Sequence, residues 1–341
     1  MNDAPHQPPT LVRDLFGWYS LTLLALGERT GLLDALIEGP GTAEEVATRA
    51  GVDTRNTFEW LRGVVAAGHA THVDGVFEVD GSTAMILGPS FPADFRAVMR
   101  FTQAVPTVMD DVALAVRSGT GVPPTAYGDV SAAASAVNTP MYRAALVQEW
   151  IAGVPCLADR LTAGARVADV AAGNGEAAAL VAEAFPASTV VGYDVAPSVS
   201  AELPANVELR RADARELPDD GPFDLVYVLD SLHHLGDPLP VLAGIHRNLA
   251  PDGVVMLVES NMSGSLDDDV ADPFAVVSYA CGVLYCLQEG LSAGGVHSNA
   301  DGTGWITDAL AETGFSDITI TASETGYAVI TAALTEPLVT G

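Results

Sequence analysis

A glycine-rich turn in the middle of the chain has the composition of a cofactor-binding loop. The segment reads Arg166-Val-Ala-Asp-Val-Ala-Ala-Gly-Asn-Gly175, so a short apolar strand with Asp169 near its end leads into Gly173 and Gly175. A glycine turn that opens a helix presents backbone N–H groups to a ligand, and a Cβ at these positions would hold that ligand off. The segment therefore predicts a ligand bound over Gly173 and Gly175.

Two more carboxylates stand where the next strands of a parallel sheet should end. Asp194 closes Val190-Val-Gly-Tyr-Asp194, roughly 20 residues after the turn, where a carboxylate accepts hydrogen bonds from both hydroxyls of a ribose. Asp213 follows the third expected strand, where it can accept from an exocyclic adenine amine, and Ala214 leaves room for the ring. Each acid alone could simply cap a loop. In this order, Asp169, Asp194 and Asp213 together predict a site for an adenosyl cofactor.

The elements that would position these acids alternate between strand and helix. From Arg166 onward, short β-branched runs alternate with helical runs, which predicts a parallel sheet covered on both faces. A helix over Met141–Leu161 precedes the first strand. We expect strands at 167–171, 189–194, 206–212, 223–229 and 253–259, helices at 175–185, 238–249, near 270–290 and at 302–314, and a terminal hairpin of Ile318–Thr321 and Tyr327–Ala332.

The front of the chain is expected to be mostly helical. Residues 10–40 have apolar positions at helical spacing, and Thr42 and Asp53 can cap two short helices that follow. The segment His72–Val79 contains an Asp-Gly turn between two short extended pieces, and residues 91–118 look helical. This order of elements resembles a winged helix.

These patterns divide the chain into three parts. We expect a winged-helix-like dimerisation or cover domain over 1–118 and a linker or mobile cover, rich in Gly, Pro, Ser and Ala, over 119–140. An α/β domain over 141–341, with a helical cap near 265–300, would hold the site.

Composition excludes several classes of function. All 15 basic residues are arginines, so the chain has no Schiff-base lysine and no P-loop lysine. The 44 carboxylates bring the formal charge to -29, and a field of that sign repels nucleic-acid phosphates and anionic membranes. The expected recognition helix offers only Arg55 and Arg62. We therefore expect neither a nucleic-acid nor a membrane partner.

The apolar runs, the first residues and the cysteines indicate where in the cell the protein is expected. No apolar run is long enough to span a membrane, and the first residues, with Asp3 and three prolines by position 9, lack the basic and apolar regions of a signal peptide. Cys156, Cys281 and Cys286 match neither a redox pair nor a zinc motif, so we interpret them as buried thiols. These observations favour a cytoplasmic protein.

With these motifs the sequence resembles the class I S-adenosylmethionine-dependent methyltransferases. The segment Phe223–Asp230 with the Ser-Leu-His-His-Leu-Gly-Asp-Pro that follows is similar to the family's fourth strand and loop, and Leu249–Val255 is similar to the step into its fifth strand. With the winged-helix-like front, the resemblance extends to the subgroup that modifies small molecules and dimerises through that domain. It implies a Rossmann-like, doubly wound sheet of seven strands, S-adenosylmethionine as cofactor, a small-molecule acceptor, a homodimer and a role in secondary metabolism.

The resemblance also implies a set of cofactor-binding residues. Ala171 stands where the family most often has its first glycine, a mild departure. Arg143 is suited to the cofactor's carboxylate. The full set is Tyr142, Arg143, Asp169, Ala171, Gly173, Gly175, Asp194, Val195, Asp213, Ala214, Asp230 and Ser231.

The residues that would bind and deprotonate the acceptor molecule are less well defined by the sequence. The stretch 294–301 departs from the family pattern, so matching does not place a general base, and His234, His297 and His233 remain the candidates. We expect no metal site, because neighbouring histidines on one loop seldom point at one ion and no third ligand is evident.

Three other functions stay open. The segment Gly173–Ala178 also fits a G-x-G-x-x-A fingerprint, typical of nicotinamide-dependent oxidoreductases. The unmatched acceptor side leaves room for a non-methylating enzyme that transfers or cyclises the cofactor's aminocarboxypropyl arm. The winged-helix resemblance suggests a ligand-sensing DNA regulator, which the charge opposes.

Overall fold

The computed structural model describes residues 9–88, 91, 94–197 and 202–334, so Asp3 and the segment tested for a signal peptide lie outside the described residues. The chain forms two compact units, Met1–Pro106 and Thr107–Gly341. This boundary falls inside the segment 91–118, for which the sequence predicts helix. No helix in the described ranges combines the length and apolar character needed to cross a membrane.

The first unit has the expected order of elements. Its helices are α1 (Thr10–Thr30), α2 (Leu32–Glu38), α3 (Ala43–Ala50), α4 (Thr54–Ala66), α5 (Gly81–Ile86) and α6 (Phe95–Ala104), and its hairpin is β1 (Ala70–Val73) with β2 (Val76–Val79). Thr42, an expected cap, forms a capping box with Glu45, and the Asp53 side chain accepts from the Asn56 N–H at the start of α4. Both caps satisfy N–H groups that a helix start leaves free.

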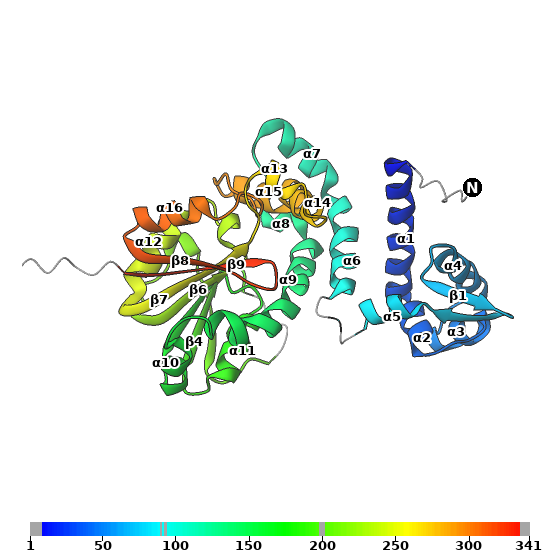
Figure 1. Ribbon diagram of the computed structural model, residues 1–341, viewed down its shortest axis with the longest axis horizontal. Coiled ribbons are helices and arrows are strands. Elements are labelled where there is room, and N and C mark those ends of the chain that lie inside the picture. Colours follow the sequence, from blue (N-terminus) through cyan, green and yellow to red (C-terminus); the bar gives the residue numbers. More distant parts are fainter. Residues whose placement is uncertain (1–8, 89–90, 92–93, 198–201, 335–341) are drawn as a thin grey trace, which may run out of the picture. The chain divides into compact units, whose positions relative to one another are not determined.

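The second unit is built on a seven-stranded sheet in the order β5-β4-β3-β6-β7-β9-β8. Five strands are parallel, and β9 and β8 form the predicted antiparallel hairpin at one edge. Figure 1 shows α10 and α11 on one face of the sheet and α12 and α16 on the other. The strands are β3 (Arg166–Val170), β4 (Thr189–Asp194), β5 (Val207–Arg211), β6 (Phe223–Leu229), β7 (Leu249–Ser260), β8 (Phe315–Ala322) and β9 (Tyr327–Leu334).

Each face of the sheet has its own apolar core, which confirms the doubly wound architecture. One core joins strand residues such as Val228 to Leu242 and Leu310 of the helices above, and the other joins Val167 to Trp150 and Val181. The helices concerned are α10 (Leu157–Ala163), α11 (Glu176–Ala184), α12 (Pro238–Asn248), α16 (Gly304–Glu312) and the π-helix η2 (Tyr142–Ile151).

Residues 119–140, which the composition suggests as a linker, are mostly helical. They contain α8 (Pro124–Tyr127) and α9 (Asp129–Met141), which runs directly into η2. Alanine is the strongest helix former, so this Ala-rich stretch continues as helix where its glycines end. Tyr127 is buried, and its hydroxyl donates to the carbonyl of Leu284 at 2.9 Å. The segment is therefore packed against the helices that follow β7.

The segment 265–300, which the resemblance suggests as a helical cap, contains several short helices, and we call these helices the cap. They are α13 (Leu266–Asp269), α14 (Ala275–Cys281), the π-helix η5 (Gly282–Cys286) and α15 (Leu287–Ser292). They lie near α7 (Met109–Ser118) and α8 in Figure 1, and the Val122 N–H donates to the Gln288 carbonyl at 3.0 Å. Short π-helical stretches are rare and often occur at functional sites.

Candidate functional site

The glycine turn after β3 is bonded directly to the end of β4. Asp194 Oδ2 accepts from the Gly173 N–H at 2.9 Å, and its Oδ1 accepts from the Ala196 N–H at 2.8 Å. Gly173 has a φ of +55°, and no described atom lies within 4 Å of the place where a Cβ would stand. The turn therefore leaves open space at Gly173 and places a carboxylate beside it.

Gly175 and Ala171 both have backbone conformations that favour glycine. Gly175 has a φ of +77°, and a Cβ there would lie 2.9 Å from the Leu209 side chain. Ala171, the predicted departure from the family pattern, has a φ of +63°. A left-handed conformation costs a non-glycine residue about 1–2 kcal/mol. The structure thus gives the physical reason why glycine is common at the position of Ala171.

Asp169 is a buried carboxylate at the base of this turn. It is 2% exposed, pairs in register with Tyr227 of β6, and burial raises its pKa to about 7. Its Oδ2 atom has no hydrogen-bond partner among the residues that the structure describes. Burial also raises the pKa of Tyr142, which η2 supplies. A carboxylate in this state would be stabilised by a cation.

Asp213 is held by an arginine that the sequence analysis did not single out. Its two carboxylate oxygens accept from Arg215 Nε at 3.0 Å and from a terminal nitrogen of Arg215 at 2.6 Å, and these bonds lower the pKa of Asp213. Arg215 also donates to the Ala293 carbonyl at 3.3 Å, after the end of α15. The Asp-x-Arg spacing in the sequence could have indicated this pairing of Asp213 with Arg215. Ala214, the next residue, is buried.

Arg143 also has a partner of its own. It forms an ion pair with Glu176 at 2.5 Å, and Glu176 accepts from the Thr139 hydroxyl at 2.7 Å. Glu176 is the first residue of α11 and directly follows Gly175, so its position beside the turn was readable from the sequence. The structure therefore places an arginine, a threonine and a glutamate at the start of α11.

The end of β6 brings Asp230 into a polar network. Asp230 has a φ of +46°, and its Oδ2 accepts from Asn138 at 2.8 Å and from the Tyr327 hydroxyl at 3.3 Å. Burial raises the pKa of Asp230. Strained backbone at a polar residue is frequent at functional sites. Ser231 bonds its own loop, through the Leu229 carbonyl at 2.7 Å, and Val195 is exposed.

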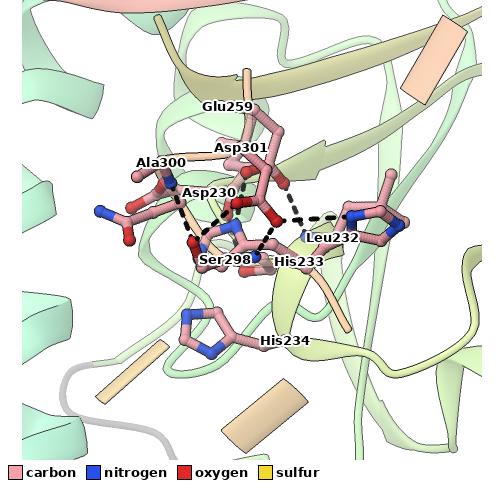
Figure 2. Close-up of polar contacts among 12 residues, drawn as sticks. Asp230, Leu232, His233, His234, Glu259, Ser298, Ala300 and Asp301 are labelled. Carbon is pink, nitrogen blue, oxygen red and sulfur yellow. Dashed lines mark hydrogen bonds and ion pairs between the residues drawn. The ribbon is translucent and has the colours of Figure 1, made fainter. Parts of the chain in front are cut away.

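His233 is buried and fixed by a glutamate of β7. Glu259 Oε2 lies 2.5 Å from His233 Nδ1, and Glu259 Oε1 accepts from the Leu232 N–H at 2.8 Å (Figure 2). Burial opposes a charge on the ring, but Glu259 holds the pKa of His233 well above its ordinary value. The sequence gives no pairing signal for Glu259, because only the sheet brings the ends of β6 and β7 together.

His234 and His297 have different surroundings. His234 Nδ1 lies 2.9 Å from Glu289 Oε2 of α15, and the side chain is 17% exposed. Burial and His233 lower the pKa of His234, but Cys286 and Glu289 outweigh them and bring it to about 9. His297 stacks on Trp305 with ring centroids 4.0 Å apart and lies 3.5 Å from Asp301. The structure thus groups His233 with His234 and gives His297 other partners.

Two family matches cover the two parts of the chain. Residues 142–289 match the family described as Methyltransferase domain, and residues 19–75 match the Rv2258c-like winged HTH domain. Together these matches span more than half of the chain.

Curated relatives are similar over part of the methyltransferase region. The 27-O-demethylrifamycin SV methyltransferase of Amycolatopsis mediterranei is 36% identical over 107 residues, which is 28% of this chain and 39% of that protein. Three other relatives are covered over 36%, 46% and 47% of their own length. The chain therefore spans less than half the length of these relatives.

Solved structures share the fold over nearly the whole chain. Human N-acetylserotonin methyltransferase in complex with S-adenosylmethionine has a TM-score of 0.68 at 16% identity, with 98% of this chain and 99% of that chain covered. The mitomycin 7-O-methyltransferase has a TM-score of 0.70 at 18% identity, with 96% and 97% covered. At these identities the likeness establishes the fold. Together with this fold, the two matches show a chain with a methyltransferase domain that follows an N-terminal winged-HTH domain.

Proposed function

We propose that this protein transfers a methyl group from S-adenosylmethionine to a small molecule. The observation that carries the proposal is the bond between Gly173 and Asp194, because it sets a carboxylate beside an open glycine turn at the carboxyl ends of parallel strands. The cofactor, when bound, supplies a methyl group on a positively charged sulfur.

The residues at the turn fit such a cofactor. We assign the ribose hydroxyls to Asp194, with Val195 beside it, and the exocyclic adenine amine to Asp213, with Ala214 under the ring. Asp169 would receive the ammonium group, since a cation there would stabilise its buried and unpartnered oxygen. Ala171, Gly173 and Gly175 would meet the cofactor with their backbone.

The remaining predicted residues would surround the methionine part of the cofactor. Tyr142, Asp230 and Ser231 lie on the segments that border this end of the sheet. Arg143 retains donors beyond its bond to Glu176, so it could share them with the cofactor's carboxylate.

A histidine on the loop after β6 would accept the proton that the acceptor loses on methylation. His234 is our first candidate, because its ring is partly exposed and lies 2.9 Å from Glu289 Oε2. Its pKa of about 9 means that only the deprotonated fraction, which grows as the pH rises, can act as the base. His297 is the second candidate, and His233 is the third because it is almost fully buried. In-line placement of the acceptor would supply most of the remaining acceleration.

The oligomeric state, the cellular location and the metabolic role are also part of the proposal. We infer a homodimer formed through the first unit, because α1 exposes a row of large apolar side chains. The three cysteines are free, which supports a cytoplasmic location. The names of two similar proteins refer to rifamycin and mitomycin, which supports a role in secondary metabolism.

The arginines of the winged-helix unit argue against a DNA-binding role. Arg55 and Arg62 of α4 lie 2.7 and 3.4 Å from the same carboxylate oxygen of Glu59. Phosphate contacts would have to compete with this glutamate within a strongly acidic protein. We therefore propose dimerisation, and not DNA binding, for this unit.

Calorimetry with S-adenosylhomocysteine tests the cofactor site. We expect Asp194→Ala to weaken binding by about 10- to 100-fold, since bonds to a charged group contribute roughly 1.5–3 kcal/mol. Asp219→Ala is the matched control, because Asp219 is exposed and pairs with Arg247. Equal affinities of both variants and the wild type would reject the assignment.

Product analysis tests the reaction. The protein is incubated with methyl-labelled S-adenosylmethionine and small-molecule extracts, and products are identified by mass spectrometry. Labelled acceptor with S-adenosylhomocysteine supports methyl transfer. Methylthioadenosine as the co-product would instead identify aminocarboxypropyl chemistry.

A further inference from the structure

Two imidazoles and a thiol meet between the sheet and the cap. A ring nitrogen of His233, a ring nitrogen of His234 and Sγ of Cys286 all lie within 4.8 Å of one another. The histidines belong to the short helix η4 (Leu232–His234), and Cys286 ends the π-helix η5. The sequence gives no sign of a third ligand for the histidine pair, because Cys286 is distant in the sequence and only folding brings it close.

Each imidazole has one nitrogen directed at a carboxylate. His233 Nδ1 lies 2.5 Å from Glu259 Oε2, and His234 Nδ1 lies 2.9 Å from Glu289 Oε2. In metal sites a carboxylate commonly holds one nitrogen of a ligating histidine, which fixes the ring and leaves the other nitrogen for the ion. His233 has that arrangement, because its Nδ1 is hydrogen-bonded to Glu259. His234 Nδ1 lies near Glu289 but has no hydrogen-bond partner among the described residues.

An unpaired buried atom is the second, independent observation. His233 is 2% exposed, and its Nε2 has no hydrogen-bond partner among the described residues. A buried polar atom without a partner costs roughly 1–3 kcal/mol. A ligand at Nε2 would remove this cost, and Nε2 is the nitrogen left free once Glu259 has engaged Nδ1.

The two cysteines of the cap differ in their placement. Cys286 is buried at 7% exposure, and its Sγ lies within 4.8 Å of a ring nitrogen of His233 and of His234. Cys281 is only partly buried, and among the described residues it belongs to no such group of possible ligand atoms. Cys286 is therefore placed for metal binding and Cys281 is not.

We propose that His233, His234 and Cys286 bind one Zn²⁺ ion. Two imidazoles and one thiolate are a ligand set that zinc prefers, and three protein ligands leave a fourth position open, as in catalytic zinc sites. Binding displaces the proton of Cys286 and any proton on the coordinating nitrogens. The ion would link the loop after β6 to the cap.

Zinc binding stands independently of the methyl-transfer proposal, but it would alter the part assigned to His234. A coordinated His234 cannot accept a proton. The ion itself would then lower the pKa of a hydroxyl bound at the open position. Metal binding is therefore measured directly and without any acceptor.

Cobalt titration of the metal-free, reduced protein tests the site. We expect one Co²⁺ per chain with thiolate-to-cobalt charge-transfer absorption, displaced by Zn²⁺. Cys286→Ser should lose this absorption, while the matched controls Cys281→Ser and Cys156→Ser should keep it. Chelator competition should show Zn²⁺ affinity reduced roughly 100-fold or more in Cys286→Ser, and about 10- to 100-fold in Glu289→Gln.

Two outcomes would overturn the proposal. One is Co²⁺ binding by the wild type without a charge-transfer band, which would indicate adventitious binding to surface carboxylates. The other is an equal band in Cys286→Ser and in the control variants. The charge-transfer band of the wild type is measured without any substitution. A variant that fails to fold therefore does not prevent the wild-type titration from rejecting the proposal.

Discussion

The backbone N–H of Gly173 donates a 2.9 Å hydrogen bond to the carboxylate of Asp194. This bond joins the loop after β3 to the last residue of β4, so the two ends of the predicted cofactor motif form one rigid corner. A carboxylate oxygen has two lone pairs, so Asp194 can hold the turn and still accept from a ribose hydroxyl. Preorganisation of this kind lowers the entropy cost of binding.

Replacing Ala171 by glycine should stabilise the protein. The φ of +63° costs alanine about 1–2 kcal/mol, and the extra freedom of glycine in the unfolded chain returns roughly 0.5–1 kcal/mol of that. We expect a net gain of about 0.5–1 kcal/mol in the free energy of unfolding, measured by urea denaturation. Ala163→Gly, at the end of α10, serves as the comparison and should not stabilise. A less stable Ala171→Gly variant would contradict the prediction.

Stability should fall with rising pH because of Asp169. Its pKa is about 7 in the folded state, against an ordinary value of 3.8, so the folded protein holds this proton where the unfolded chain has lost it. The contribution of Asp169 to stability therefore declines between pH 3.8 and about pH 7, by roughly 4 kcal/mol at most. Asp169→Asn should remove this decline in urea unfolding, and the exposed control Asp219→Asn should keep it.

The same carboxylate should make cofactor binding depend on pH. An ammonium group at Asp169 favours the ionised form, so S-adenosylhomocysteine should bind more tightly as the pH rises through about 7. Calorimetry in buffers of different pH measures this effect. An unchanged pH dependence in Asp169→Asn would assign the effect to another group.

Asp213 should discriminate between adenine and hypoxanthine. The wild type should bind S-adenosylhomocysteine about tenfold more tightly than S-inosylhomocysteine, which lacks the exocyclic amine. Asp213→Ala should lose this preference, whereas Arg215→Ala should retain it, because Arg215 only holds the carboxylate in place. If Asp213→Ala kept the preference, the amine would lie elsewhere.

The exposed face of α1 should control the oligomeric state. Phe16 is 58% exposed and lies on α1 with exposed Leu15 and Tyr19. We expect Phe16→Asp to halve the mass measured by light scattering after gel filtration. Val73→Asp is the control, since Val73 is an exposed apolar residue on β1. A monomeric wild type, or a dimeric Phe16→Asp variant, would contradict the proposed interface.

Local patterns were sufficient for most of the fold. The capping box of Thr42 and Glu45, the hairpin after Ala70 and the strands at 189–194 and 223–229 follow from short-range chemistry, and the structure confirms them. The seven-stranded sheet with its terminal antiparallel hairpin, which the family resemblance implies, is confirmed as well. The glycines of 119–140 lie before α8 or between α8 and α9, the alanines after them form helix, and Pro140 is accommodated inside α9.

Sequence alone determined the glycine turn and the acids at the strand ends, and tertiary structure decided the partners of His233 and His234. The residues Asp169, Gly173, Gly175 and Asp194 lie at fixed offsets from strand ends, and parallel strands bring such ends to one edge of a sheet. Glu259, Glu289 and Cys286 meet His233 and His234 from β7 and the cap, at sequence separations that no local pattern encodes. Their partnership depends on how the cap packs against the loop after β6, and long-range packing of that kind is set by the whole core.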